Sequence, residues 1–275
     1  MSDEIDMYGG DKHPWGKRHD LHSLFRKYDP CIVRVQVDLP DGGIGNGTAF
    51  HIGGGTFATA AHVVRGYDNP TLFQGNTRQD ETGWPVTDIL YHPDDADVAI
   101  LVSDLWRDLS VKHTNEERGH STPASHIEIP EMWGEWIEQS LILTRGIFCG
   151  YPVVPRSDGA YKLAASAEIH TDINRYDTSD VHFLVSSTAR GGFSGAPFIS
   201  EFDMLLGIVT EALYDDDSHP YMAVIAIESI YPILEREDVL RGRLEHYLAS
   251  WSKLHRSLEA RLALERQQRS LRSTS

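Results

Sequence analysis

A serine framed by glycines is the residue of this chain best suited to act as a nucleophile. The segment Arg190–Pro197 reads Arg-Gly-Gly-Phe-Ser-Gly-Ala-Pro, with the serine at position 194. Its glycines have no side chain to bury, and a proline cannot extend a central strand, so the segment is expected to form an exposed turn. Such a turn leaves the hydroxyl of Ser194 reachable and lets nearby backbone N–H groups point at the space in front of it. The segment therefore predicts nucleophilic chemistry at Ser194.

Two further segments supply partners for that hydroxyl. A glycine hairpin and a short apolar strand ending in small residues precede His62, and the small residues leave room for a second side chain against the imidazole. Asp97 opens an apolar strand at the edge of a core, where a carboxylate can accept from the second imidazole nitrogen. Asp94 and Asp95 compete for this role, but they lie in the turn before the strand. The three motifs occur in the order His, Asp, Ser.

Taken together, these motifs resemble those of the trypsin-like (chymotrypsin-fold) serine peptidases, and in particular the disulfide-free bacterial branch. The resemblance covers about residues 30 to 230 and rests on three segments, Thr59–His62, Asp97–Leu101 and Gly192–Pro197. Further matches are Gly47–Phe50, Gly150–Pro152 and Gly207–Thr210.

The resemblance implies a serine endopeptidase that works through an acyl-enzyme. His62 would take the proton of Ser194 and return it to the leaving amine, and Asp97 would hold the imidazole in the productive tautomer. The backbone N–H groups of Gly192 and Ser194 would form the oxyanion hole. The expected partner is a protein or peptide substrate, and no cofactor is required.

Specificity residues follow from the same resemblance. The primary pocket would be lined by Thr188 and Arg190 before the serine turn, and by Thr210, Glu211 and Ala212 on the facing strand. Thr188 stands where trypsin has an acidic pocket base, so this position does not favour Arg or Lys at the cleaved residue. The backbone of this strand is expected to pair with an extended substrate.

One departure from the zymogen-activated members concerns Phe193. Those members carry an aspartate before the serine, which pairs with a freshly cut N-terminus, and a phenylalanine cannot form that ion pair. We therefore expect control by a partner, by the C-terminal tail or by the N-terminal arm.

Short strand signals predict an all-β fold of two six-stranded antiparallel β-barrels with a C-terminal α-helical extension. The expected divisions are an N-terminal arm (1–30), a peptidase domain (31–235) and a helical tail (236–275). Within the peptidase domain we expect barrel 1 over about 31–103, a connector over 104–140 with a short helix near 131–139, and barrel 2 over about 141–228. The expected strands lie near 31–38, 47–52, 55–59, 70–74, 85–91, 97–103, 141–150, 161–171, 181–187, 196–200, 205–212 and 221–227.

The tail carries a nearly heptad apolar seam from Leu240 to Leu262. Its first part is expected to pack on the second barrel, and the remainder to self-associate, to bind a regulatory protein or to pack on its own body. Charge is divided unevenly, with a net +5 in residues 239–275 against −16 for the whole chain. The acidic body disfavours nucleic acid and anionic membranes as partners.

Composition predicts a cytoplasmic protein. Only Cys31 and Cys149 occur, too few for the disulfides of a secreted peptidase, and the acidic N-terminus has no apolar signal core. Neither an apolar run long enough for a membrane span nor a metal or nucleotide motif is present. Two alternatives remain open at this point: a catalytically idle barrel that binds a peptide or protein in its cleft, and an esterase that uses the same site.

Overall fold

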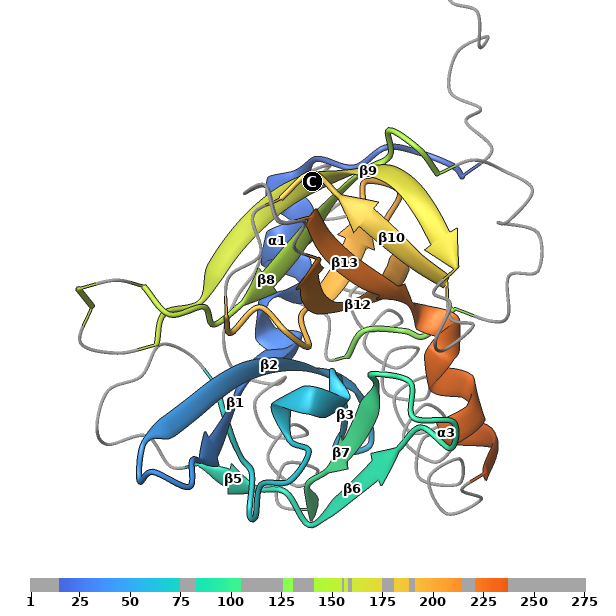
Figure 1. Ribbon diagram of the computed structural model, residues 1–275. Coiled ribbons are helices and arrows are strands. Elements are labelled where there is room, and N and C mark those ends of the chain that lie inside the picture. The colour runs from blue at the N-terminus through green and yellow to red at the C-terminus, as the bar shows by residue number, and fades with distance from the viewer. Residues whose placement is uncertain are drawn as a thin grey trace, which may run out of the picture.

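The structure, a computed structural model, places two β lobes next to each other, one above the other in Figure 1. It describes residues 15–74, 83–104, 126–130, 141–154, 156–157, 160–174, 181–187, 191–213 and 221–236. The first lobe comprises β1 (Ile32–Asp38), β2 (Ile44–Gly53), β3 (Thr56–Thr59), β4 (Thr71–Phe73), β5 (Trp84–Pro85), β6 (Asp88–Tyr91) and β7 (Ala99–Val102). The second comprises β8 (Arg145–Gly150), β9 (Leu163–Asn174), β10 (Val181–Val185), β11 (Pro197–Ser200), β12 (Leu205–Leu213) and β13 (Tyr221–Ala226).

Short helices flank the lobes. They are α1 (Leu21–Tyr28), α3 (Tyr231–Arg236) and the 3₁₀ turns η1 (Asp29–Cys31), η2 (Ala61–Val63) and η4 (Ile227–Ile230). The expected all-β, chymotrypsin-like fold class is confirmed. The helix expected near 131–139 and the tail beyond residue 236 lie outside the described residues, so the expected domain boundaries stay predictions.

The second lobe is a closed antiparallel barrel in the order β10-β13-β12-β11-β8-β9. The first lobe is a curled seven-stranded sheet in the order β5-β4-β1-β2-β3-β7-β6. It has one strand more than expected because the run 85–91 is divided between its two edges. The N–H of Val86 donates to Pro70 beside β4, and that of Thr87 donates to Val102 on β7, so the chain changes edges between these two residues.

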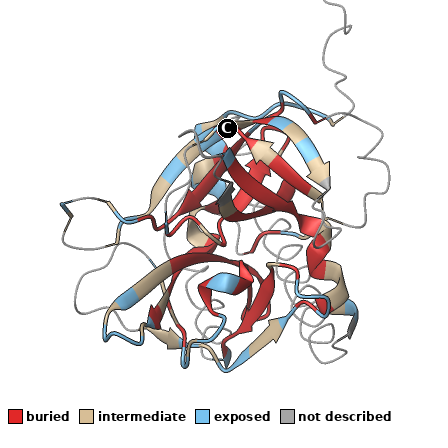
Figure 2. Cartoon of the chain, viewed as in Figure 1, coloured by how far each residue is buried: buried red, intermediate tan, exposed pale blue. Residues whose placement is uncertain are grey.

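Side chains that point alternately to the two faces of a strand contribute to two different apolar clusters. On β7, Ala99 and Leu101 face the interior of the first lobe, while Ile100 and Val102 belong to a larger cluster shared with α1 and the second lobe. Successive side chains of a strand point to opposite faces, so one short apolar strand serves both cores. Figure 2 shows buried residues along the strands of both lobes. Tyr151 is fully buried in the shared cluster, and its hydroxyl lies 3.5 Å from the carbonyl oxygen of Ile32.

The described part of the N-terminal arm is attached to the second lobe. Asp20 caps the N-terminus of helix α1, and its side chain accepts from the backbone N–H of Ser23 at 2.9 Å. Lys27 and Tyr28, at the other end of the helix, both bind the carboxylate of Asp203 in the turn between β11 and β12. The arm therefore anchors the far end of the hairpin that follows the serine turn.

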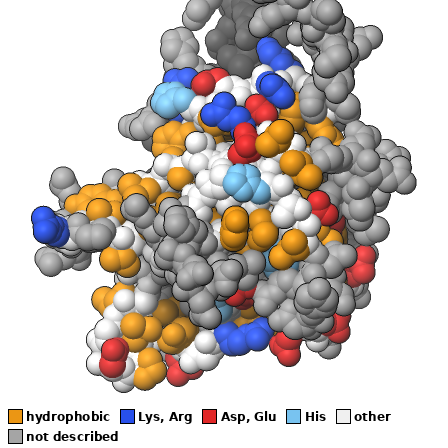
Figure 3. Space-filling model, turned by 45° about the horizontal axis from the view of Figure 1, so that its top comes forward, with side chains coloured by type: hydrophobic (Ala, Val, Ile, Leu, Met, Phe, Trp, Pro, Cys, Tyr) orange, Lys and Arg blue, Asp and Glu red, His pale blue; other side chains and the backbone are white. Residues whose placement is uncertain are grey.

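Charged side chains of both signs lie interspersed among apolar ones on the face seen in Figure 3. Among the described residues on this face, the acidic side chains do not form one continuous patch. Among the described helices, none is long and apolar enough to cross a membrane.

Candidate active site

His62 lies in the 3₁₀ turn η2 directly after β3. The alanines before it, Ala60 and Ala61, are fully buried, whereas the His62 side chain is 47% exposed. The pairing of β3 with β7 sets Thr59 opposite Ala99. Asp97 lies two residues before Ala99, and this register brings its carboxylate beside the turn that carries His62.

Asp97 binds His62 through both carboxylate oxygens. Its Oδ2 lies 2.7 Å from Nδ1 of the imidazole, and its Oδ1 accepts from the backbone N–H of His62 at 2.9 Å. The other two candidate carboxylates have different surroundings. Asp95 lies 3.4 Å from the guanidinium of Arg65, and Asp94 donates its backbone N–H to a ring nitrogen of His92. Of the three aspartates, Asp97 is the one that contacts the imidazole.

Ser194 lies in the tight turn that precedes β11 in the second lobe. The N–H of Ala196 donates to the carbonyl of Phe193 at 2.8 Å, and that of Gly195 donates to Val209 on β12 at 2.7 Å. Gly195 has a φ of +87°, and a Cβ there would meet the carbonyl oxygen of Thr48, so only glycine fits. These constraints hold the serine at the tip of the turn.

Phe193 anchors the same turn in the core of the second barrel. Its side chain is buried and meets the ring of Phe148 edge to face, with the centroids 4.9 Å apart. The position that carries a charged aspartate in the zymogen-activated members is therefore an apolar contact in this chain.

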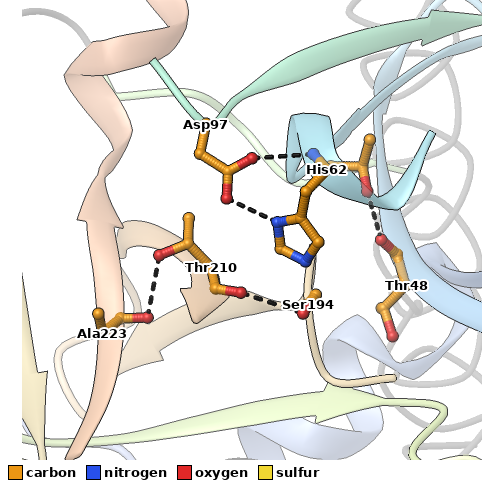
Figure 4. A network of polar contacts seen from close by, with 7 residues as sticks. Thr48, His62, Asp97, Ser194, Thr210 and Ala223 are labelled. Atoms are coloured by element: carbon orange, nitrogen blue, oxygen red, sulfur yellow. Dashed lines mark hydrogen bonds and ion pairs between the residues drawn. The ribbon is translucent and has the colours of Figure 1, made fainter. Parts of the chain in front are cut away.

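The two lobes bring the three residues together. Figure 4 shows the imidazole of His62 between the Asp97 carboxylate and Ser194, with its second ring nitrogen facing the serine. The hydroxyl of Ser194 donates to the carbonyl oxygen of Thr210 on β12 at 3.0 Å.

The peptide groups of the serine turn have fixed directions. The carbonyl of Gly191 accepts from the N–H of Val153 at 3.2 Å. Because the C=O and N–H of a trans peptide point in opposite directions, the N–H of Gly192 points away from Val153. Gly192 itself has a φ of +99°, which favours glycine.

The expected specificity residues are only partly described. Thr188 and Arg190 lie outside the described residues, and for Ala212 only the backbone, in β12, is described. Thr210 is buried, and its hydroxyl donates to the carbonyl of Ala223 at 3.4 Å. Glu211 is half-buried. The use of the Thr210 carbonyl by Ser194 was not anticipated from the sequence, because no local pattern encodes it.

The family model for the trypsin-like peptidase domain matches residues 47–208, which include all three residues of the site. The chain belongs to the trypsin-like peptidases. No curated protein sequence matches it.

Solved structures of proteases resemble this trypsin-like peptidase in fold. The active form of the Rv3671c protease from M. tuberculosis aligns with a TM-score of 0.56 and 19% identity, over 80% of this chain and 87% of that one. The HtrA-type protease AlgW with a tripeptide aligns with a TM-score of 0.54 and 15% identity, over 82% and 64% of the two chains. A serine endoprotease from Yersinia pestis aligns with a TM-score of 0.53 and 14% identity, over 82% and 68%.

The trypsin-like peptidase fold therefore extends beyond the residues matched by the family model. Within the described residues of the peptidase, no group of three or more His, Cys, Asp or Glu side chains is arranged to hold a metal ion. Cys31 and Cys149 are both buried free thiols.

Proposed function

We propose that the protein is a serine endopeptidase with Ser194 as nucleophile, His62 as general base and acid, and Asp97 as the residue that orients the imidazole. The observation that carries the proposal is the 2.7 Å contact between Nδ1 of His62 and Asp97, with the other ring nitrogen facing Ser194. A carboxylate that accepts from Nδ1–H leaves the second nitrogen unprotonated and able to accept a proton. The exposure of the imidazole leaves room for a substrate beside it.

The reaction proceeds in two halves. Oγ of Ser194 bonds to the carbonyl carbon of the scissile peptide while its proton moves to His62, and the N–H groups of Gly192 and Ser194 stabilise the oxyanion. His62 then gives this proton to the leaving amine as the C–N bond breaks. Water then gives a proton to His62 and attacks the acyl carbon; the ester bond to Oγ breaks, His62 returns the proton to Ser194, and the carboxylic acid product leaves.

The substrate is proposed to be an extended peptide that pairs with the backbone of 210–212. Strand β11 pairs with β12 as far as Pro197 opposite Ile208, so an extended peptide beside residues 210–212 would continue the sheet on the β11 side of β12. Thr188, Arg190, Thr210, Glu211 and Ala212 are proposed to line the pocket for the cleaved residue.

Regulation is proposed to act without a cut N-terminus, because Phe193 is held in an apolar contact with Phe148. The tail 236–275 continues from α3, and its apolar seam is proposed to serve first as packing on the body and then as a surface for a regulatory protein or a second copy. The two free buried thiols support a cytoplasmic location.

Labelling with a fluorophosphonate probe tests the proposed nucleophile, since the probe reacts with an activated serine and releases fluoride. The wild type should be labelled, and Ser194→Ala and His62→Ala should not. Equal labelling of the wild type and Ser194→Ala would remove the assignment. An unlabelled wild-type protein that binds peptides would favour the idle-barrel alternative.

A further inference from the structure

The serine turn is held from the opposite lobe by one threonine. We propose that Thr48 is a positioning residue that fixes the peptide groups of the Ser194 turn in their catalytic directions. Thr48 lies on β2 of the first lobe and is fully buried. The inference rests on the proposed function, since it assigns Thr48 a role in the same reaction.

Thr48 contacts the second lobe through its backbone and its hydroxyl. Its N–H donates to the carbonyl of Ser194 at 2.9 Å. Its hydroxyl donates to the carbonyl of Gly192 at 2.7 Å and accepts from the N–H of Tyr151 at 3.0 Å. In turn, the carbonyl of Thr48 accepts from the hydroxyl of Thr59 at 2.6 Å, so Thr48 is itself held in place.

With the bonds to Thr48, each of the four carbonyl groups of residues 191–194 has a hydrogen-bond donor. The carbonyls of Gly191 and Phe193 accept from Val153 and Ala196 within the second lobe, and those of Gly192 and Ser194 accept from Thr48. Each fixed carbonyl directs the N–H of the same trans peptide to the opposite side. The proposed oxyanion donors, the N–H groups of Gly192 and Ser194, belong to peptides that alternate with the two peptides held by Thr48.

The two lobes approach each other closely at Thr48. A Cβ on Gly150 would lie 2.6 Å from Oγ1 of Thr48, and a Cβ on Gly195 would meet the carbonyl oxygen of Thr48. Glycines at these positions allow the two lobes to approach this closely. A valine at position 48 would keep the shape of the side chain but remove the hydrogen bonds that the Thr48 hydroxyl makes with the carbonyl of Gly192 and the N–H of Tyr151, which favours a shift of the turn.

The experiment compares Thr48→Val and Thr48→Ser with a matched control, Thr56→Val. Thr56 is also a fully buried threonine of the first lobe whose hydroxyl donates to a backbone carbonyl, that of Gly53, away from the serine turn. The readouts are kcat and KM on a reporter peptide, expressed per active site titrated with a fluorophosphonate.

Thr48→Val should lower kcat by about tenfold or more and leave KM nearly unchanged. The loss should stay below the roughly 10²–10³-fold that follows removal of a whole oxyanion donor, because both donors are still present in the variant. Thr48→Ser keeps the hydroxyl and should have a kcat close to that of the wild type. Thr56→Val should also have a wild-type kcat, even if this variant melts at a lower temperature. A Thr48→Val protein with wild-type kcat per titrated site would overturn the inference, as would equal losses in Thr48→Val and Thr56→Val. If Thr48→Val does not fold, Thr48→Ala removes the same hydroxyl without an added methyl group and carries the same expectations.

A second measurement separates this inference from the proposed function. In protein that also carries Ser194→Ala, Thr48→Val should accelerate amide hydrogen exchange at Gly195 and Ala196 at least tenfold relative to Thr56→Val. Unchanged exchange would overturn the positioning role whether or not the wild type is an enzyme. Absence of labelling in the wild type, by contrast, would count against the proposed function alone.

Discussion

Replacing Asp97 by asparagine would test the proposed triad without removing a side chain. The carboxylate uses one oxygen for Nδ1 of His62 and the other for the backbone N–H of His62. An asparagine has one acceptor oxygen and one donor NH₂. Because the backbone N–H can only donate, the amide oxygen must face it, and the NH₂ then faces Nδ1. Nδ1 must therefore accept, which moves the ring proton to the nitrogen that faces Ser194.

The expected magnitude follows from this change of tautomer. An imidazole protonated toward the serine cannot accept its proton, and in a Ser-His-Asp triad this fault lowers turnover by about 10⁴-fold. The loss corresponds to about 5.5 kcal/mol of transition-state stabilisation. Both hydrogen bonds of residue 97 are kept in the variant, so its melting temperature should stay within about 4 °C of that of the wild type.

The assay is the second-order rate constant of fluorophosphonate labelling, measured with the melting temperature of each variant. Asp94→Asn and Asp95→Asn are the matched controls, because neither side chain contacts His62, and both should label within about threefold of the wild type. The reasoning is refuted if Asp97→Asn keeps most of the reactivity while either control loses it.

Three further predictions concern the turn, the thiols and the tail. Gly192→Ala should abolish labelling, because its Cβ would meet the carbonyl of Tyr151 at a φ of +99°, whereas Gly191→Ala, whose Cβ meets nothing within 4 Å, should label normally; equal labelling of the two would contradict this. Burial raises the pKa of Cys149 to about 12 and that of Cys31 further. Mass spectrometry should therefore find both thiols unmodified after native protein is treated with iodoacetamide at pH 8, and both modified in urea. Truncation after residue 258 should leave folded, probe-reactive protein, and truncation after residue 238 should lower the melting temperature or cause aggregation. If the protein truncated after residue 238 melts at the full-length temperature, the tail is not part of the core.

The second barrel could be predicted closely from the sequence, since its six short apolar runs end at glycine, proline or polar residues and fall on β8–β13. The run 85–91 in the first lobe could not be divided from local pattern. Its division depends on where Val86 and Thr87 find acceptors, and those acceptors, Pro70 beside β4 and Val102 on β7, lie near opposite edges of the sheet.

The site shows the same contrast. His62, Asp97 and Ser194 each have a local signature, in small neighbours, in the start of an apolar strand and in flanking glycines. Thr48 appeared in the sequence only as part of a motif shared with the family. Its contacts with the serine turn join residues about 145 positions apart, and only the packing of the two lobes brings them together.

The division of the site between two lobes has a consequence for biosynthesis. As the chain is synthesised, His62 and Asp97 emerge with the first lobe, and Ser194 follows only when most of the second has been made. Under the proposed assignment, neither lobe alone can cleave a peptide, because the base and the nucleophile meet only after the lobes have docked. Under the same assignment, nascent and half-folded chains would not cleave neighbouring proteins, and proteolytic activity would appear only after both lobes have folded.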